Sequence, residues 1–137
     1  MGLRCNTSYT SFRKNSLTGL FMVTIDILRK VALSFPETTE EPHFEKTSFR
    51  VKKKIFATFD EKNNRACIKL SEIDQNVFSS SVKSIFPVPN KWGKQGWTLV
   101  DMKKVKKEQF KDALTTAYCE VAPTKLSHLV RPNENND

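Results

Sequence analysis

The stretch that decides the fold is Asn90-Lys91-Trp92-Gly93-Lys94-Gln95-Gly96-Trp97-Thr98-Leu99-Val100-Asp101, which holds both tryptophans of the chain and two of its four glycines. Glycines reach positive φ without steric cost, so a tight or bulged turn is favoured here. The aromatic and β-branched run that follows it is typical of a strand. We therefore expect a glycine-rich loop that leads into a strand with Trp97 in the core. Trp92 lies between two lysines, and the sequence does not decide whether its ring is buried or stacks on a partner.

Upstream, the sequence predicts a three-stranded antiparallel meander. Apolar and polar residues alternate over residues 48–51, which is the period of a strand with one buried face. Lys52 and Lys53 make the turn, and residues 54–59 form the return strand. After a second turn, residues 65–70 form the third strand. The first hairpin thus has a cationic tip.

Three helical patterns complete the domain. Thr24 can cap a first helix that Pro36 ends, and Ser71 can cap a short second one. The second helix carries Ile73, Val77 and Phe78 on its apolar side. The third has the clearest helical period, through Phe110, Ala113, Leu114, Ala117, Tyr118 and Val121. The order α-β-β-β-α-β-α predicts an α+β fold, an antiparallel sheet with helices packed on one face.

A length of 137 residues fits one domain, which we place at residues 22–131. Residues 1–21 contain no acid and many Ser, Thr and Asn, so we expect a disordered N-terminal extension, and residues 132–137 form a frayed tail. No apolar run is long enough to span a membrane. The three cysteines are odd in number and widely separated, which favours a reducing compartment and small buried thiols.

The charge is polarised along the chain, and the formal net charge is +8. Residues 46–54 carry five basic side chains and no acid, and residues 83–111 carry eight lysines against Asp101 and Glu108. Residues 22–45 are acidic. Such polarity favours a polyanionic partner, although lysine-rich surfaces also arise for solubility.

No catalytic or metal-binding constellation stands out. His43 and His128 are far apart, and neither lies in a metal-ligand motif. The glycines at 93 and 96 lack the strand before them and the helix after them that a phosphate-binding loop needs. We therefore expect no enzymatic activity, no catalytic residue, no metal and no other cofactor.

Four segments carry a family resemblance: SFPETTEEPHF at 34–44, FRVKKKIFA at 49–57, GWTLVD at 96–101 and AYCEVAPTKL at 117–126. In order and spacing they resemble the MmcQ/YjbR family of small bacterial proteins, over about four-fifths of the chain. The resemblance implies a CyaY-like α+β fold, a cytoplasmic location and a DNA-binding role in which paired hairpins act as wings. Residues 1–21 have no counterpart in the family pattern.

The two basic segments match the expected wings. The nucleic-acid-binding residues we expect are Arg50, Lys52, Lys53, Lys54, Lys91, Trp92 and Lys94. Because lysines suit phosphates rather than base edges, the expected partner is DNA with little sequence preference. The expected protein is a monomer without a membrane partner.

Two other functions stay open. A protein-interaction or chaperone-like module would use the sheet face and bind no nucleic acid. A metal or small-molecule binder is suggested by the CyaY-like fold, but the acids of residues 22–45 do not align on one helical face.

Overall fold

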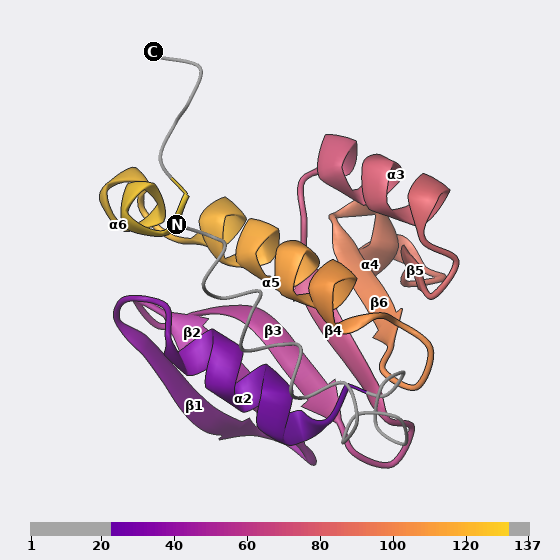
Figure 1. The fold of residues 1–137 in the computed structure, drawn as a ribbon, viewed down its shortest axis with the longest axis horizontal. Helices are drawn as coiled ribbons and strands as arrows, with labels where there is room; N and C mark the ends of the chain where they lie inside the picture. The colour runs from indigo at the N-terminus through magenta and orange to yellow at the C-terminus, as the bar shows by residue number, and fades with distance from the viewer. Residues whose placement is uncertain (1–22, 132–137) are drawn as a thin grey trace, which may run out of the picture.

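The computed structural model describes residues 23–131, drawn in colour in Figure 1. The helices are α2 (Ile25–Leu33), α3 (Glu72–Ser81), α4 (Lys91–Lys94), α5 (Lys107–Val121) and α6 (Thr124–Val130). The strands are β1 (Thr38–His43), β2 (Lys46–Val51), β3 (Lys54–Asp60), β4 (Arg65–Lys69), β5 (Ile85–Pro87) and β6 (Trp97–Asp101). The extension and the tail expected at the two chain ends lie outside the described residues.

The six strands form one antiparallel sheet in the order β1-β2-β3-β4-β6-β5. The first four strands follow one another as a meander, β6 joins β4, and β5 lies at the edge beyond β6. Helices α2 and α5 lie across one face of this sheet (Figure 1). The expected α+β fold, with an antiparallel sheet and helices on one face, is therefore confirmed.

A β-bulge shapes the core face of the sheet. Phe49 pairs with Ala57, but Arg50 pairs with Ile55, so Phe56 is the extra residue on β3. Bulges re-aim side chains relative to the regular alternation of a strand. Phe56 and Ala57 are both fully buried, and the Phe56 ring centroid lies 5.4 Å from that of Tyr118 on α5. The bulge thus directs the Phe56 ring into the core.

Helix α5 supplies the helical half of the core, as its apolar period predicts. Its side chains at Phe110, Ala113, Leu114, Ala117 and Tyr118 are fully buried. The Tyr118 ring packs 4.8 Å from that of Phe35, and its hydroxyl donates to the carbonyl oxygen of Pro36 at 2.7 Å. The hydroxyl therefore finds a partner where the ring enters the core, as a buried tyrosine requires.

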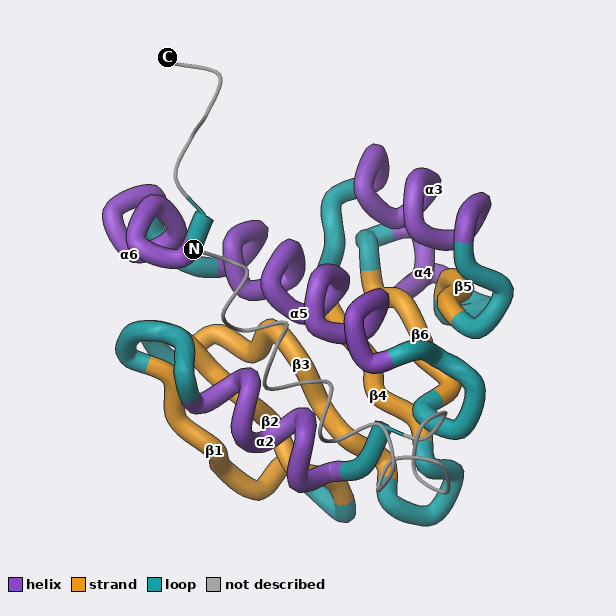
Figure 2. Tube along the Cα trace, in the orientation of Figure 1, coloured by secondary structure: helices purple, strands orange, loops and turns teal. Residues whose placement is uncertain are grey.

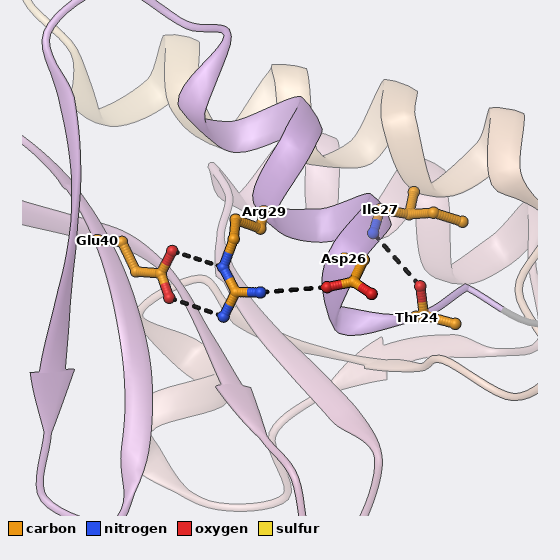
Figure 3. A network of polar contacts seen from close by, with 5 residues as sticks. All are labelled: Thr24, Asp26, Ile27, Arg29 and Glu40. Atoms are coloured by element: carbon orange, nitrogen blue, oxygen red, sulfur yellow. Dashed lines mark hydrogen bonds and ion pairs between the residues drawn. The ribbon is translucent and has the colours of Figure 1, made fainter.

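Polar contacts attach α2 to the edge strand β1 (Figure 3). The hydroxyl of Thr24 accepts a hydrogen bond from the N–H of Ile27 at 3.4 Å and caps the helix. The Arg29 guanidinium makes a bidentate pair with Glu40, with Nε 2.8 Å from Oε1 and the second nitrogen 2.9 Å from Oε2. Asp26 accepts a third bond from Arg29 at 3.2 Å. A single arginine thus joins helix and strand.

Two of the strands were not expected from the sequence. The acidic residues 37–42 predict a link, but residues 38–43 form β1 by antiparallel pairing with β2; there Arg29 pairs with Glu40, and Arg50 lies 3.9 Å from Glu41. An edge strand also tolerates Pro42 and charged side chains. Residues 85–87 were interpreted as loop, but they form the short edge strand β5.

The expected burial is wrong at two places. On α3, Ile73 is 74% exposed and Val77 is 56% exposed, whereas Gln75 is buried. On β6, Thr98 and Val100 face the core, so the alternation of the strand leaves Trp97 half-buried on the opposite face rather than in the core. Among the described residues, no helix is both long enough and apolar enough to cross a membrane.

Candidate nucleic-acid interface

The β2–β3 turn has an unusual backbone for its sequence. Lys52 and Lys53 have φ values of 51° and 70°, which is the conformation of a two-residue type I′ turn. That turn favours Asn-Gly, because a side chain at positive φ is strained by about 1 kcal/mol or more. Two consecutive lysines are therefore held at the hairpin tip despite a local cost, and both are exposed.

Only part of the basic charge on this hairpin is available to a partner. The Nζ of Lys52 forms an ion pair with Glu37 at 2.8 Å. Arg50 lies back on the open sheet face, where its side chain is 23% exposed, faces Glu41 and donates to the Ser48 hydroxyl at 3.0 Å. Lys53 and Lys54 are exposed and form no ion pair with any described residue. They are the hairpin cations best placed to meet an anion.

The second basic segment is a helical turn rather than the expected glycine-rich loop. Residues Lys91–Lys94 form α4, visible between β5 and β6 in Figure 2. The side-chain oxygen of Asn90 caps it by accepting from the N–H of Trp92 at 2.9 Å. Lys91 and Lys94, three residues apart, share one side of the turn and are exposed, and Trp92 is 49% exposed.

The two glycines of this segment allow close backbone contacts. A Cβ on Gly93 would stand 1.9 Å from the carbonyl oxygen of Val88, and one on Gly96 would stand 1.9 Å from that of Leu70. Gly96 also has a φ of 105°, and its carbonyl accepts from the N–H of Leu70 at 2.9 Å. Gly96 is therefore required for the conformation of the turn. Gly93 is required because α4 lies against the backbone of Val88 and leaves no room for a side chain.

A buried glutamine outside the expected site residues holds α4 in place. The side-chain nitrogen of Gln75 donates to the carbonyl oxygens of Gly93 at 2.9 Å and Trp97 at 3.2 Å, and to the Thr98 hydroxyl at 3.0 Å. Burying an amide requires such partners. Gln75 turns toward β6, and this orientation leaves Ile73 and Val77 facing outward.

The register brings the two basic segments to one end of the sheet. Strands β3 and β6 both run antiparallel to β4, which lies between them, so Lys54 and Trp97 begin their strands at the same end. The hairpin tip and α4 thus lie at the same end of the strands, on the two sides of β4, although they are far apart in the sequence.

Lys69 is a further cation at this end that the sequence analysis missed. It is the last residue of β4 and pairs with Trp97. Its Nζ lies 3.2 Å from the position that a Cβ on Gly96 would occupy, which places the amine beside the α4–β6 turn. Strand alternation puts Lys69 on the open face, but its position near α4 depends on the pairing of β4 with β6.

The cysteines of the described residues are not poised for nucleophilic chemistry. Burial raises the pKa of Cys67 to about 11, partly opposed by the charge of Lys46, and burial also raises the pKa of Cys119. Reactive cysteines need a lowered pKa. Both thiols are half-buried rather than fully buried as expected. Within residues 23–131, no group of three or more His, Cys, Asp or Glu side chains is arranged to hold a metal ion.

The comparisons with known proteins agree with this fold. The family model YjbR matches residues 33–120, a span that runs from the end of α2 through most of α5. The chain belongs to the YjbR family. No curated protein sequence matches this YjbR-family chain closely enough to count as a relative.

A solved structure is similar to this YjbR-family protein. It is the crystal structure of a Deinococcus radiodurans protein that carries the domain DUF419. The two chains are 24% identical and superpose with a TM-score of 0.63, over 73% of this chain and 79% of the other. At this identity, the likeness concerns the fold.

Proposed function

We propose that this YjbR-family protein binds double-stranded DNA through its phosphates, at the sheet end that carries the β2–β3 turn and α4. The observation that carries this proposal is that two exposed lysine pairs lie at the same end of the sheet. Lys53 and Lys54 come from the hairpin, and Lys91 and Lys94 come from α4. None of the four is ion-paired with a described residue. Such a role fits a cytoplasmic protein without catalytic activity.

The two segments can contact separate parts of one duplex backbone. They lie on the two sides of β4 at the same end of the strands, so each lysine pair can meet phosphates of its own. Lys69, at the end of β4, can add a contact between them.

The side chains favour phosphate contacts over base readout. Bidentate reading of bases uses Arg, Asn or Gln, and Arg50 already donates to Ser48 and to the carbonyl oxygen of Pro42. Lysine acts on phosphates as a point charge. Trp92, half-exposed between the α4 lysines, can pack against sugar or an unstacked base. Little sequence preference is expected.

The strength of binding follows from the number of phosphates neutralised. Four contacts give a slope of about −3.6 for the logarithm of affinity against the logarithm of salt concentration. A fourfold rise in salt should then weaken binding about a hundredfold. Such steep dependence distinguishes phosphate binding from contact through apolar surfaces.

The test is fluorescence anisotropy with two unrelated duplexes at two salt concentrations. The double variant Lys53→Glu/Lys94→Glu should lose at least about tenfold in affinity on both duplexes, because two of four contacts become repulsive. The control Lys62→Glu/Lys103→Glu has the same net charge but changes the opposite end of the sheet. It should retain most of the binding, and both variants should keep the melting temperature, since exposed lysines contribute little to folding.

Absence of binding at low salt, or equal loss in both double variants, would contradict the proposal. Tight binding to only one duplex would retain DNA as the partner but overturn the phosphate-dominated mechanism.

A second candidate is a protein-interaction surface on the open face of the sheet. Ile55, Trp97 and Leu99 lie there, half-buried, on the side away from the core. A partner bound to this face would bury apolar area, so its affinity would change little with salt. Retention from solution on an immobilised duplex, lost at high salt, favours DNA. No retention on the duplex even at low salt favours the sheet face.

A further inference from the structure

A second basic site lies at the opposite end of the sheet from α4. A pocket of about 380 Å³ opens between the α3–β5 link and the loop from β6 to α5. These two segments are joined by a hydrogen bond of 2.8 Å from the N–H of Asp101 to the carbonyl oxygen of Ser84. In Figure 1 both segments lie on the same side of the molecule, beside the start of α5. The proposed DNA-binding surface makes no use of this pocket.

Three lysines converge on the pocket. Lys83 comes from the α3–β5 link, and Lys104 and Lys106 come from the loop before α5. None of them forms an ion pair with a described residue. Asp101 is the one acid of the lining, and its carboxylate already accepts from the N–H of Lys103 at 3.0 Å. The lining therefore carries an excess of two positive charges.

A serine hydroxyl in the pocket wall is free to meet a ligand. Ser84 is 8% exposed as a residue, and its side chain makes no hydrogen bond to any described residue. The hydroxyls of the other serines in residues 23–131 all make one. Ser84 thus offers a donor to a ligand in the pocket.

The N-terminus of α5 adds a positive electrostatic potential, which has the same sign as the charge of the three lysines. This helix of 15 residues begins at Lys107, and Lys106, at the cap position, provides no side-chain acceptor. The Gln109 side chain accepts from the N–H of Lys106 at 3.3 Å, so the N–H groups of the first helical turn have no side-chain cap. Such a helix start favours an anion. Lys106 and Gln109 both line the pocket, so this helix end borders it.

We propose that the pocket binds the phosphate of a small phosphomonoester. Three ammonium groups and the Ser84 hydroxyl match a dianion with several acceptor oxygens. The volume exceeds that of a phosphate ion and falls in the range of small-ligand sites, so there is room for an organic part. Phe86, half-buried in the wall, provides an aromatic surface for that part, as a nucleoside requires. The chemical class is a mononucleotide or a similar phosphomonoester.

The experiment is a titration of the full chain, followed by amide NMR and calorimetry at constant ionic strength. The probes are adenosine 5′-monophosphate, inorganic phosphate and adenosine. The monophosphate should shift the amide resonances around Ser84 and the start of α5, phosphate should shift the same resonances more weakly, and adenosine should have little effect. Ser84→Ala should weaken monophosphate binding about tenfold, because a hydrogen bond to a charged oxygen is lost.

Charge is tested with a matched pair of variants. Lys104→Gln should weaken binding about threefold to tenfold, whereas Lys62→Gln, an exposed turn lysine away from the pocket, should leave it within about twofold. Melting curves establish that each variant is folded. Unchanged affinity in both Ser84→Ala and Lys104→Gln would overturn the proposal. Shifts spread evenly over all lysine-rich surfaces would do the same, since they would indicate charge screening alone.

A short DNA duplex separates the two sources of phosphate. If duplex binding falls in Ser84→Ala as much as monophosphate binding does, the pocket accepts nucleic-acid backbone and the small-ligand proposal is wrong. If duplex binding instead falls only in Lys53→Glu/Lys94→Glu, while that variant still binds the monophosphate, the two sites are independent. Failure of either proposal is therefore distinguishable from failure of the other.

Discussion

The Nζ atom of Lys52 lies 2.8 Å from Oε1 of Glu37, and both residues have positive φ, at 51° and 56°. The first belongs to the β2–β3 turn, and the second to the link between α2 and β1. One ion pair thus joins two strained backbone positions at the end of the sheet where DNA is proposed to bind. It also withdraws one lysine from the basic surface.

Removing the acid of this pair should strengthen DNA binding. In Glu37→Gln, Lys52 becomes free to contact a phosphate, so affinity should rise about threefold and the salt slope should steepen by about 0.9. Stability should change by less than about 1 kcal/mol, because both side chains are about half exposed. Anisotropy at several salt concentrations measures both effects. Glu61→Gln, in the exposed β3–β4 turn, is the control, and an equal gain there would indicate a general charge effect.

Replacing the turn lysines should separate stability from binding. The double variant Lys52→Asn/Lys53→Gly places the residues that a type I′ turn prefers at these positive φ values. We expect a gain of about 1 kcal/mol in the free energy of unfolding, together with weaker DNA binding. Urea unfolding and anisotropy on the same protein test this. A destabilised variant would show that the turn differs from the one described.

Gln75 should matter for stability although it is polar. Gln75→Met keeps an unbranched side chain but removes the hydrogen bonds from the amide to the carbonyl oxygens of Gly93 and Trp97 and to the Thr98 hydroxyl. The expected loss is about 1–3 kcal/mol in the free energy of unfolding. Asn76→Met, at the exposed neighbouring position, should change stability by less than about 0.5 kcal/mol. Equal effects of the two changes would argue against the buried amide as the link between α3 and α4.

The α5 stripe should be sensitive to truncation. Leu114→Ala and Tyr118→Ala should each cost about 2–5 kcal/mol, as for other buried large-to-small changes. Tyr118→Phe should cost about 1 kcal/mol, because only the bond to the Pro36 carbonyl is lost. Denaturant unfolding measures all three. A neutral effect of either alanine would contradict the packing of α5 on the sheet.

Cys67 should react slowly with alkylating agents. Its pKa of about 11 leaves only a trace of thiolate at pH 8, so alkylation should be about a hundredfold slower than for a free thiol and should rise about tenfold per pH unit. The raised pKa favours the neutral thiol in the folded state. Its contribution to stability is therefore present below the unfolded pKa of about 9 and is lost as pH rises toward 11. Mass spectrometry of Cys5→Ser/Cys119→Ala isolates this thiol, and fast reaction at pH 8 would contradict the shift.

Patterns of local period were sufficient for much of the fold. A period of two in the apolar residues predicts the β2–β3 hairpin and the third strand of the meander. A period of 3.6 predicts α5 and its buried stripe. Such patterns report which side chains avoid water, and the local chain determines that directly. For the same reason, the family resemblance could be recognised from four short segments.

Elements that depend on distant partners were missed. Strand β1 carries two glutamates in succession and a proline, and it forms by pairing with β2, where Arg29 from α2 and Arg50 from β2 lie beside those acids. The face of α3 was misjudged because Gln75 finds three acceptors on α4 and β6. Neither effect is visible in a window of neighbouring residues.

The amino-acid sequence by itself determined the fold class, the core stripe of α5 and the two basic segments, because hydrophobic period and charge are local properties of the chain. The tertiary structure alone decided that those segments lie at the same end of the sheet, that Glu37 forms an ion pair with Lys52, and that Lys69 lies beside the α4–β6 turn. It also decided that Ser84 and three lysines share a pocket at the other end. These relationships depend on strand pairing between residues far apart in the sequence, and such pairing is settled by packing of the whole domain.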